Sequence, residues 1–230
     1  MSSQKKLESS RIAYINKYGE YHREDGPAII QIDGTQMWLQ NNHKHRIDGP
    51  AITLLSGHQE WWLHNSRHRE DGPAVIKENG DKIWYRQGHK HREGGPAVEL
   101  SNGTKEWWHK DLRHREDGPA IEYVGGWQSW FQHNKSHRVD GPAIINASGK
   151  YWYLKGKLHR ENGPAIILNN GTEQWYMDGL LHREDGPAIS FEGEHQWWFQ
   201  NEYYGYNLDL ENFIKMIDAK KRQVFANKLL

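Results

Sequence analysis

The residues best suited to chemistry in this chain are histidine–arginine pairs that recur along its 230 residues. The eight pairs begin at His22, His45, His68, His91, His114, His137, His159 and His182. The planar guanidinium of arginine can bind two oxygens of a phosphate or carboxylate at once. Stacked repeats would therefore line up an anion-binding ladder. The candidates for such a ladder are Arg69, Arg92, Arg115, Arg138 and Arg160.

A structural role for the same motif is the competing interpretation. An aspartate follows most of these arginines by two places, at Asp25, Asp48, Asp71, Asp117, Asp140 and Asp185. Gly94 and Asn162 replace it in two blocks. Aspartates in such turns accept hydrogen bonds from backbone amides, and they can pair with arginine. Because every block carries the motif, we favour a building role over a single binding site.

An enzyme is not expected from this sequence. Catalysis needs one asymmetric set of acid, base or nucleophile, whereas this chain repeats near-copies of one set. It contains no cysteine, no glycine-rich phosphate loop and no metalloprotease motif. The triplets beginning at His43 and His89 read His-Lys-His but lack an evident third metal ligand, so we interpret them as loop residues. We predict no catalytic residues, no metal site and no cofactor.

Two rows of mostly aromatic residues accompany the pairs. The first aromatic row consists of Trp38, Trp61, Trp84, Trp107, Trp130, Trp152, Trp175 and Trp197. The second aromatic row consists of the residues that follow, Leu39, Trp62, Tyr85, Trp108, Phe131, Tyr153, Tyr176 and Trp198. Adjacent strand residues face opposite sides, so we expect the first row to be interior and the second to be partly exposed. The alternative is a closed solenoid that buries both rows.

Exposed contiguous aromatic residues are typical of binding surfaces. Trp127 follows Gly125 and Gly126 and lies outside the repeat pattern, which makes it a candidate binding hot spot. The candidate binding residues are therefore Trp62, Tyr85, Trp108, Trp127, Phe131, Tyr153, Tyr176 and Trp198.

The spacing of these residues defines the elements that must position them. The pairs recur every 23 residues, with one interval of 22 between His137 and His159, which gives eight repeats over about residues 22–203. In each repeat, Gly-Pro-Ala indicates a turn in which Gly tolerates positive φ and Pro restricts it. A β-prone stretch and a second turn such as Asp33-Gly34 follow, which is typical of a hairpin. We predict an all-β fold, an elongated array of eight 23-residue β-hairpin repeats in an open twisted sheet or solenoid.

The two ends of the chain depart from the repeat. We expect residues 1–12 to be a flexible segment, residues 13–206 to form the repeat array, and residues 207–230 to form a helix. Asn207 is the expected N-cap, and Phe213 and Ile217 belong to one apolar face. We favour a helix that caps the last sheet edge over one that binds a partner. A homodimer formed through the sheet edge or this helix is a further prediction.

The block from Trp175 to Gly186, WYMDGLLHREDG, resembles the MORN repeat. That family has an aromatic pair, a loop with glycine and then His-Gly-x-Gly before a strand. This chain has Arg183 at the first of those two glycines and adds Pro187 and Ala188. It is more similar to the HREDGPA-type arrays of bacteriophages and large DNA viruses. The resemblance covers about four-fifths of the chain. It implies a β-hairpin array and roles in protein scaffolding, dimerisation or phospholipid contact.

Composition restricts the functions that remain. Thirty basic side chains balance 30 acidic ones, which argues against double-stranded nucleic acid as the partner. Zero net charge, with no basic amphipathic face, argues against membrane binding. Without an apolar leader or span, we expect a cytoplasmic protein, or one in the host cytoplasm if viral.

We therefore expect a non-enzymatic repeat scaffold that binds a protein partner. The resemblance to phage arrays implies an inhibitor of a host bacterial defence protein. The alternative is a sponge that sequesters a nucleotide or another small anion on the arginine and aromatic rows.

Overall fold

The first seven repeats each fold into two short antiparallel hairpins on either side of the first-row tryptophan, whereas in the eighth repeat Trp197 lies within one longer strand, β32 (Glu194–Phe199). The computed structural model describes residues 4–8 and 10–227. In the first repeat, β3 (Ile29–Gln31) pairs with β4 (Gln36–Met37), and β5 (Leu39–Gln40) pairs with β6 (His43–Lys44). The all-β array of hairpin repeats is thereby confirmed, followed by one C-terminal helix among the described residues.

The division into strands is finer than the sequence pattern indicates. We expected Trp38 and Leu39 to share one strand, but β4 ends at Met37. The backbone N–H of Trp38 donates to the carbonyl of Ala51 at 2.7 Å, and its carbonyl accepts from the N–H of His45 at 3.1 Å. The tryptophan backbone therefore bonds to the next block, and the chain passes from one hairpin to the other there.

The chain divides into two compact units, of which the first comprises residues 1–114 and 120–124. Its main sheet pairs strands in chain order and consists of β1 (Gln4–Glu8), β2 (Arg11–Ile15), β3, β4, β7 (Ile52–Thr53), β8 (Gln59–Glu60), β11 (Val75–Ile76), β12 (Lys82–Ile83), β15 (Val98–Glu99), β16 (Lys105–Glu106) and β19 (Ile121–Glu122). Its short hairpins are β5–β6, β9 (Trp62–Leu63) with β10 (Ser66–Arg67), β13 (Tyr85–Arg86) with β14 (His89–Lys90), and β17 (Trp108–His109) with β18 (Leu112–Arg113).

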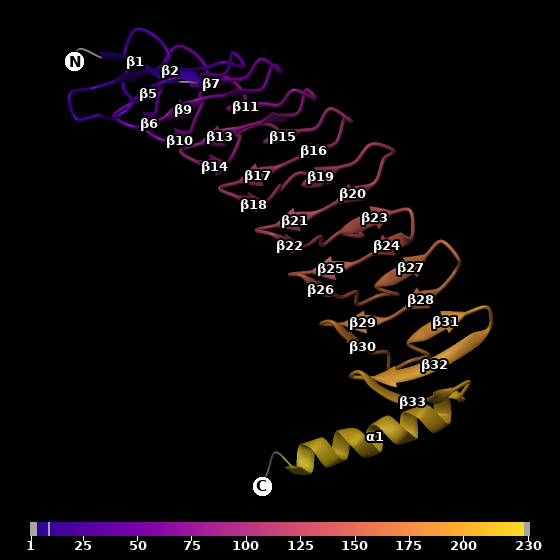
Figure 1. Cartoon of the computed structure of the whole chain (residues 1–230). Helices are drawn as coiled ribbons and strands as arrows, with labels where there is room; N and C mark the ends of the chain where they lie inside the picture. The colour runs from indigo at the N-terminus through magenta and orange to yellow at the C-terminus, as the bar shows by residue number, and fades with distance from the viewer. Residues whose placement is uncertain (1–3, 9, 228–230) are drawn as a thin grey trace. The chain divides into compact units, whose positions relative to one another are not determined.

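The second unit comprises residues 115–119 and 125–230, described as far as residue 227. Its main sheet consists of β20 (Gln128–Ser129), β23 (Ile144–Asn146), β24 (Gly149–Tyr151), β27 (Ile166–Leu168), β28 (Glu173–Gln174), β31 (Ile189–Phe191), β32 (Glu194–Phe199) and β33 (Glu202–Tyr206). Its short hairpins are β21 (Phe131–Gln132) with β22 (Lys135–Ser136), β25 (Tyr153–Leu154) with β26 (Lys157–Leu158), and β29 (Tyr176–Met177) with β30 (Leu180–Leu181). In each unit the short hairpins follow one side of the main sheet (Figure 1).

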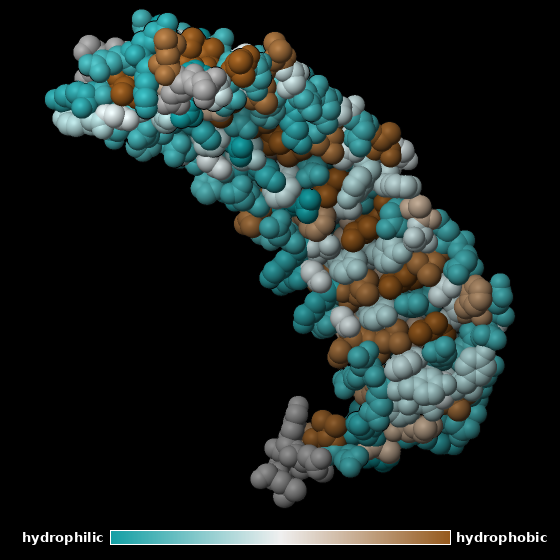
Figure 2. Space-filling model, viewed as in Figure 1, coloured by the Kyte–Doolittle hydropathy of each residue, from teal (hydrophilic) through white to brown (hydrophobic). Residues whose placement is uncertain are grey.

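The core of the repeats contains a row of alanines, and in the first unit the residue after each alanine is buried as well, at Ile29, Ile52, Val75, Val98 and Ile121. The alanine after each repeat proline is completely buried, at Ala28, Ala51, Ala74, Ala97, Ala120, Ala143, Ala165 and Ala188. The first-row tryptophans are half-buried, apart from Trp197, which is 5% exposed. Apolar bands over β23–β28 remain visible from outside in Figure 2. This arrangement explains how a chain with a mean hydropathy of −1.00 folds, since small side chains fill the space between blocks.

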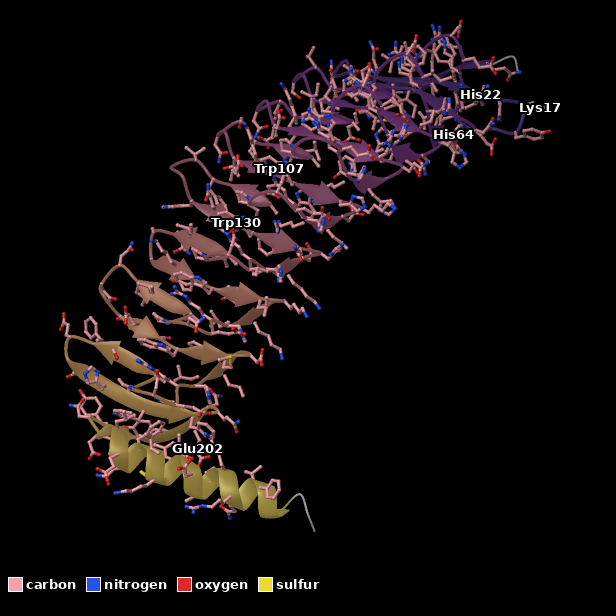
Figure 3. The ribbon with its side chains drawn as sticks, turned by 180° about the vertical axis from the view of Figure 1, so that it is seen from behind. Lys17, His22, His64, Trp107, Trp130 and Glu202 are labelled. Atoms are coloured by element: carbon pink, nitrogen blue, oxygen red, sulfur yellow. The ribbon has the colours of Figure 1, made fainter. Side chains whose placement is uncertain are left out.

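The helix α1 (Leu210–Asn227) covers the last strands of the second unit (Figure 1). Phe213 is fully buried and Ile217 is 2% exposed, and both belong to a cluster with Trp197 and Phe199. Glu202 of β33, beside α1 in Figure 3, accepts a hydrogen bond from Lys220 at 2.6 Å. Among the described residues, no helix is long and apolar enough to cross a membrane.

The N-cap of α1 is Asp209, whereas the sequence analysis assigned Asn207. The Oδ1 atom of Asp209 accepts from the N–H of Asn212 at 2.8 Å, which satisfies one of the free amides in the first turn. Asn207 instead pairs with His195, donating from its N–H and accepting at its Oδ1, both at 2.8 Å. The expected helix reaches residue 230, but residues 228–230 lie outside the described part.

The start of the chain also differs from the expected flexible segment. Strand β1 pairs with β2 over five residues, from Gln4 opposite Ile15 to Glu8 opposite Arg11. Residues 1–3 and 9 of the segment lie outside the described part. Residues 13–15, where the repeat array was expected to begin, are part of β2, which also pairs with β3. A hairpin therefore precedes the first repeat.

Candidate binding surface

The repeat arginines lie flat on the tryptophans of the preceding blocks. The Cζ atom of Arg69 lies 4.2 Å from the ring centroid of Trp61, and that of Arg160 lies 4.0 Å from the centroid of Trp152. The same contact joins Arg46 to Trp38, Arg92 to Trp84, Arg138 to Trp130 and Arg183 to Trp175. A guanidinium over an indole is a favourable cation–π contact, stronger where water is excluded. The arginine row thus covers the first aromatic row.

Most of these guanidiniums are also bonded within their own turn. The Nε atom of Arg69 donates to Oδ1 of Asp71 at 2.9 Å, and its Nη1 donates to the carbonyl of Pro73 at 3.4 Å. The Nε-to-aspartate bond recurs for Arg23, Arg46, Arg115, Arg138 and Arg183. The hydrogen bond from Arg69 and its charge lower the pKa of Asp71, which therefore stays ionised. These contacts support the structural interpretation of the motif.

The glycine of each Gly-Pro-Ala triplet leaves room for this arginine. A Cβ atom on Gly72 would lie 2.9 Å from Cζ of Arg69, and one on Gly26 would lie 2.6 Å from Cζ of Arg23. We expected these glycines to supply positive φ, but of the eight triplet glycines only Gly163, at 149°, is among the residues with positive φ. For the other seven the requirement is for close approach, not for a left-handed backbone.

The two blocks without aspartate differ from each other. Arg92, in the block with Gly94, uses Nη1 to reach Oε1 of Glu99 at 2.9 Å. Arg160, in the block with Asn162, donates to the carbonyl of Pro164 at 3.1 Å. No ion pair to Arg160 is found among the described residues.

The histidines of the pairs act as hydrogen-bond acceptors toward the short hairpin at the end of their own repeat. The Nδ1 atom of His68 accepts from the N–H of Gln87 at 3.1 Å, and Nδ1 of His182 accepts from Gln200 at 3.2 Å. His22, His45, His137 and His159 accept in the same way from the first turn residue of the following short hairpin. The donors have φ near +50°, as Gln87 does at 51°, so the contact joins each histidine to a tight two-residue turn.

The second aromatic row in the first unit alternates with cations. Trp62 lies between Lys44, whose Nζ is 4.2 Å from the ring centroid, and Arg67, whose Cζ is 4.9 Å away. Trp108 lies in the same way between Lys90 at 4.0 Å and Arg113 at 4.7 Å. We name this set the cation–aromatic ladder, and its members are Lys44, Trp62, Arg67, Tyr85, Lys90, Trp108 and Arg113.

Two glutamates hold the tryptophans of the ladder in place. The Oε2 atom of Glu60 accepts from Nε1 of Trp62 at 2.7 Å, and Glu106 accepts from Trp108 at 2.9 Å. Burial would raise the pKa of Glu60, but hydrogen bonds from His58, Trp62 and Arg67 outweigh it, and the pKa is lowered. Glu60 is therefore an anion, and its charge offsets part of the positive charge of the ladder.

The second aromatic row in the second unit has uncharged residues opposite it across the short hairpins. The residues opposite Phe131, Tyr153 and Tyr176 across the short hairpins are Ser136, Leu158 and Leu181, respectively. Burial raises the pKa of Tyr153 and Tyr176, so both phenols are neutral. Trp198 donates from Nε1 to Oε1 of Gln196 at 3.2 Å. All four aromatic residues are half-buried, so this row forms an apolar surface.

Trp127 occupies a position that small polar residues hold in sister repeats. It lies three residues before a first-row tryptophan, where other blocks have Thr35, Asp81 and Thr104, each 6% exposed. Trp127 is 46% exposed and follows two glycines with positive φ. It is therefore the predicted site residue with the most accessible ring.

The described histidines of the two His-Lys-His triplets are not grouped with enough other ligands to bind a metal ion. His89 pairs through Nδ1 with Oδ2 of Asp111 at 2.6 Å. Within residues 4–8 and 10–227, no three histidine, aspartate or glutamate side chains are grouped to hold a metal ion.

The sequence analysis missed the four cations of the ladder. Each lies five residues after a member of the second aromatic row and faces it across a short hairpin, as Arg67 faces Trp62. The signal was present in the turn residues between them, which end in Asn42, Asn65, Gly88 and Asp111. Such residues favour the positive φ of two-residue hairpins.

A comparison of the sequence with protein-family models found no matching family, and a comparison with curated proteins found no match.

Proposed function

We propose that this chain is a non-enzymatic MORN-like repeat scaffold that binds a protein partner through its second aromatic row. The observation that carries the proposal is the cation–aromatic ladder. Tryptophan, tyrosine and arginine are the side chains most enriched in the energetic centres of protein interfaces. The four cations of the ladder outnumber the two carboxylates beneath it, so the ladder suits an acidic partner surface.

The second unit would add an apolar contribution to the same function. The residues opposite its half-buried aromatic residues are uncharged, and Trp127 adds accessible aromatic surface. An exposed tryptophan loses little conformational entropy on binding, which makes it an efficient anchor. The proposed partner therefore has apolar as well as acidic contact groups.

The resemblance to phage arrays directs the search for the partner toward bacteria. We propose that binding inhibits a defence protein in the cytoplasm of a bacterial host. Sequestration of nucleotides on the arginine row has less support, because most of these guanidiniums already bond an aspartate in their own turn.

Affinity purification from bacterial lysate with the full chain tests the proposal. Trp62→Ala combined with Trp108→Ala should weaken the binding of a specifically recovered protein at least about 30-fold, since hot-spot truncations cost roughly 1–2 kcal/mol or more each. Lys44→Glu combined with Lys90→Glu should do the same while keeping the rings. Trp127→Ala should weaken binding with little loss of thermal stability, because its ring is largely exposed.

The matched control is Lys82→Ala combined with Lys105→Ala, which removes two exposed lysines from the main sheet of the first unit. This control should retain the partner at the wild-type level. Equal recovery with the ladder variants and with the control would contradict the proposed surface. A partner retained fully by the Lys→Glu variant would contradict the acidic nature of its contact.

A further inference from the structure

The repeats provide an internal comparison for each arginine of the row. In the block of Arg138, the Nε atom donates to Oδ1 of Asp140 at 2.8 Å, and in the block of Arg183 it donates to Asp185 at 2.7 Å. Nη1 of the same arginines reaches the carbonyls of Pro142 and Pro187. Each block therefore shows how this fold binds a carboxylate: the oxygen lies beside Nε, and the other side of the guanidinium is held by the turn.

The block of Arg160 keeps this arrangement but lacks the carboxylate. Arg160 stacks on Trp152 at 4.0 Å and donates from Nη1 to Pro164 at 3.1 Å, as its sister residues do. Asn162 replaces the aspartate and carries no charge. The other departing block compensates, because Arg92 pairs with Glu99. Among the described residues, Arg160 has no equivalent pairing.

A cavity of about 390 Å³ opens beside this guanidinium, entirely within the second unit. Arg160 and Asn162 line it, together with the rings of Trp152 and His159 and the apolar side chains of Val139 and Leu154. Val139 replaces the glutamate usual at its position in the motif. It is 83% exposed, so it presents an apolar group to the solvent. The cavity thus combines apolar walls with one cation, Arg160, that has no ion pair among the described residues, as small-ligand sites combine apolar walls with a few polar groups.

We propose that Arg160 binds the carboxylate of a ligand in the place that an aspartate side chain occupies in the sister blocks. The ligand carries its carboxylate on an apolar body, which contacts Val139, Leu154 and Trp152. The site goes beyond the proposed function, because it requires no partner on the second aromatic row.

The charges around the cavity favour a carboxylate over a phosphate. Arg138, which also lines it, is already paired with Asp140 at 2.8 Å. Glu161 is exposed at the rim, so the net formal charge of these four side chains is zero. A monoanion meets Arg160 with little repulsion, whereas a phosphate dianion meets two nearby carboxylates.

Titration of the arginine Nε–H signals by NMR tests the assignment with the full chain. The probes are benzoate, as a free small acid, and a terminally blocked glutamate, as the carboxylate of a protein side chain. We expect the Arg160 signal to shift in a saturable way, with a Kd on the order of 1 mM for the tighter probe. The tighter probe identifies the source of the carboxylate.

Two reciprocal variants make the test specific. Asn162→Asp restores the internal carboxylate and should weaken binding at least about ten-fold, while leaving the other arginine signals in place. Asp140→Asn removes the carboxylate beside Arg138 and should create a second site there. The wild-type chain already has asparagine at this position of one block, so this variant is expected to fold.

Three results would overturn the assignment. The first is the absence of an Arg160 shift with both carboxylates up to about 50 mM, well above the expected Kd. The second is unchanged binding in Asn162→Asp. The third is inorganic phosphate binding more tightly than either carboxylate. None of these results bears on partner recovery by the cation–aromatic ladder, so the two proposals fail separately.

Discussion

At the scale of single residues, the glycine in each Gly-Pro-Ala triplet is required by the arginine three residues before it, whose guanidinium lies against the glycine. A Cβ on Gly72 would lie 2.9 Å from Cζ and 3.0 Å from Nε of Arg69. The guanidinium cannot move away without leaving the ring of Trp61 and the carboxylate of Asp71. We therefore expect Gly72→Ala to lower the free energy of unfolding by about 1–2 kcal/mol, measured by chemical denaturation.

A double-mutant cycle isolates the cause of this loss. In an Arg69→Ala background the clash disappears, so Gly72→Ala should then cost less than about 0.5 kcal/mol. Gly95→Ala is the matched control, because its Cβ would lie at 3.2 Å from Arg92 and needs a smaller adjustment. An equal cost of Gly72→Ala with and without Arg69 would place the cause in the backbone.

At the scale of elements, α1 closes the array of the second unit through two side chains. Phe213 is fully buried and lies 4.8 Å from Trp197 between ring centroids. Phe213→Ala should lower the free energy of unfolding of the helix and the last hairpin by about 3–4 kcal/mol. In a repeat protein each block contacts mainly its neighbours, so the loss should stay local.

Native-state hydrogen exchange measures this locality. Amides of β32 and β33 should lose protection in Phe213→Ala, while those of β23 and β24 keep most of theirs. Ile214→Ala, on an exposed side of α1, is the matched control and should change little. Uniform loss of protection throughout the second unit would show that its blocks unfold together.

At the scale of the whole molecule, the histidine row makes stability depend on pH. Burial lowers the pKa of His45, with a smaller effect of His64, and burial lowers that of His182 despite the charge of Glu184. The unfolded chain therefore binds more protons than the folded chain as the pH falls below about 6.5. Stability should be full above that pH and decline as the pH falls toward the folded pKa values.

For His45 and His182 the hydrogen bonds give the same sign as the burial. Nδ1 of His45 accepts from the N–H of His64 at 3.3 Å, Nδ1 of His182 accepts from the N–H of Gln200 at 3.2 Å, and protonation of that nitrogen removes the acceptor. The melting temperature, measured from pH 8 to pH 5.5 at constant salt, should fall, and His45→Gln should reduce the slope. A melting temperature that rises on acidification would show that the charge of Glu184, which favours the protonated form of His182, dominates instead.

The sequence by itself determined the repeat, its period and its all-β class. Those properties depend on local chemistry: glycine and proline exclude helix, and turn residues such as Asp33-Gly34 form hairpins within a few residues. The apolar face of α1, including Phe213 and Ile217, was also predictable because it follows from helical spacing. Each of these signals lies within a short window of the chain.

Only the tertiary structure decided what the motif residues do. Arg69 covers Trp61, and His68 accepts from Gln87, 19 residues further along the chain. The same nonlocal stacking explains why a glycine is needed beside Arg69. The prediction that this glycine supplies positive φ was wrong, because the stacked guanidinium and not the backbone conformation excludes a side chain there. The sequence showed that Asn162 replaces an aspartate, but only the structure shows that Arg160 keeps its contacts with Trp152 and Pro164 while Arg92 pairs with Glu99. Contacts between blocks set these roles, and a periodic sequence shows that such contacts recur without showing which atoms meet.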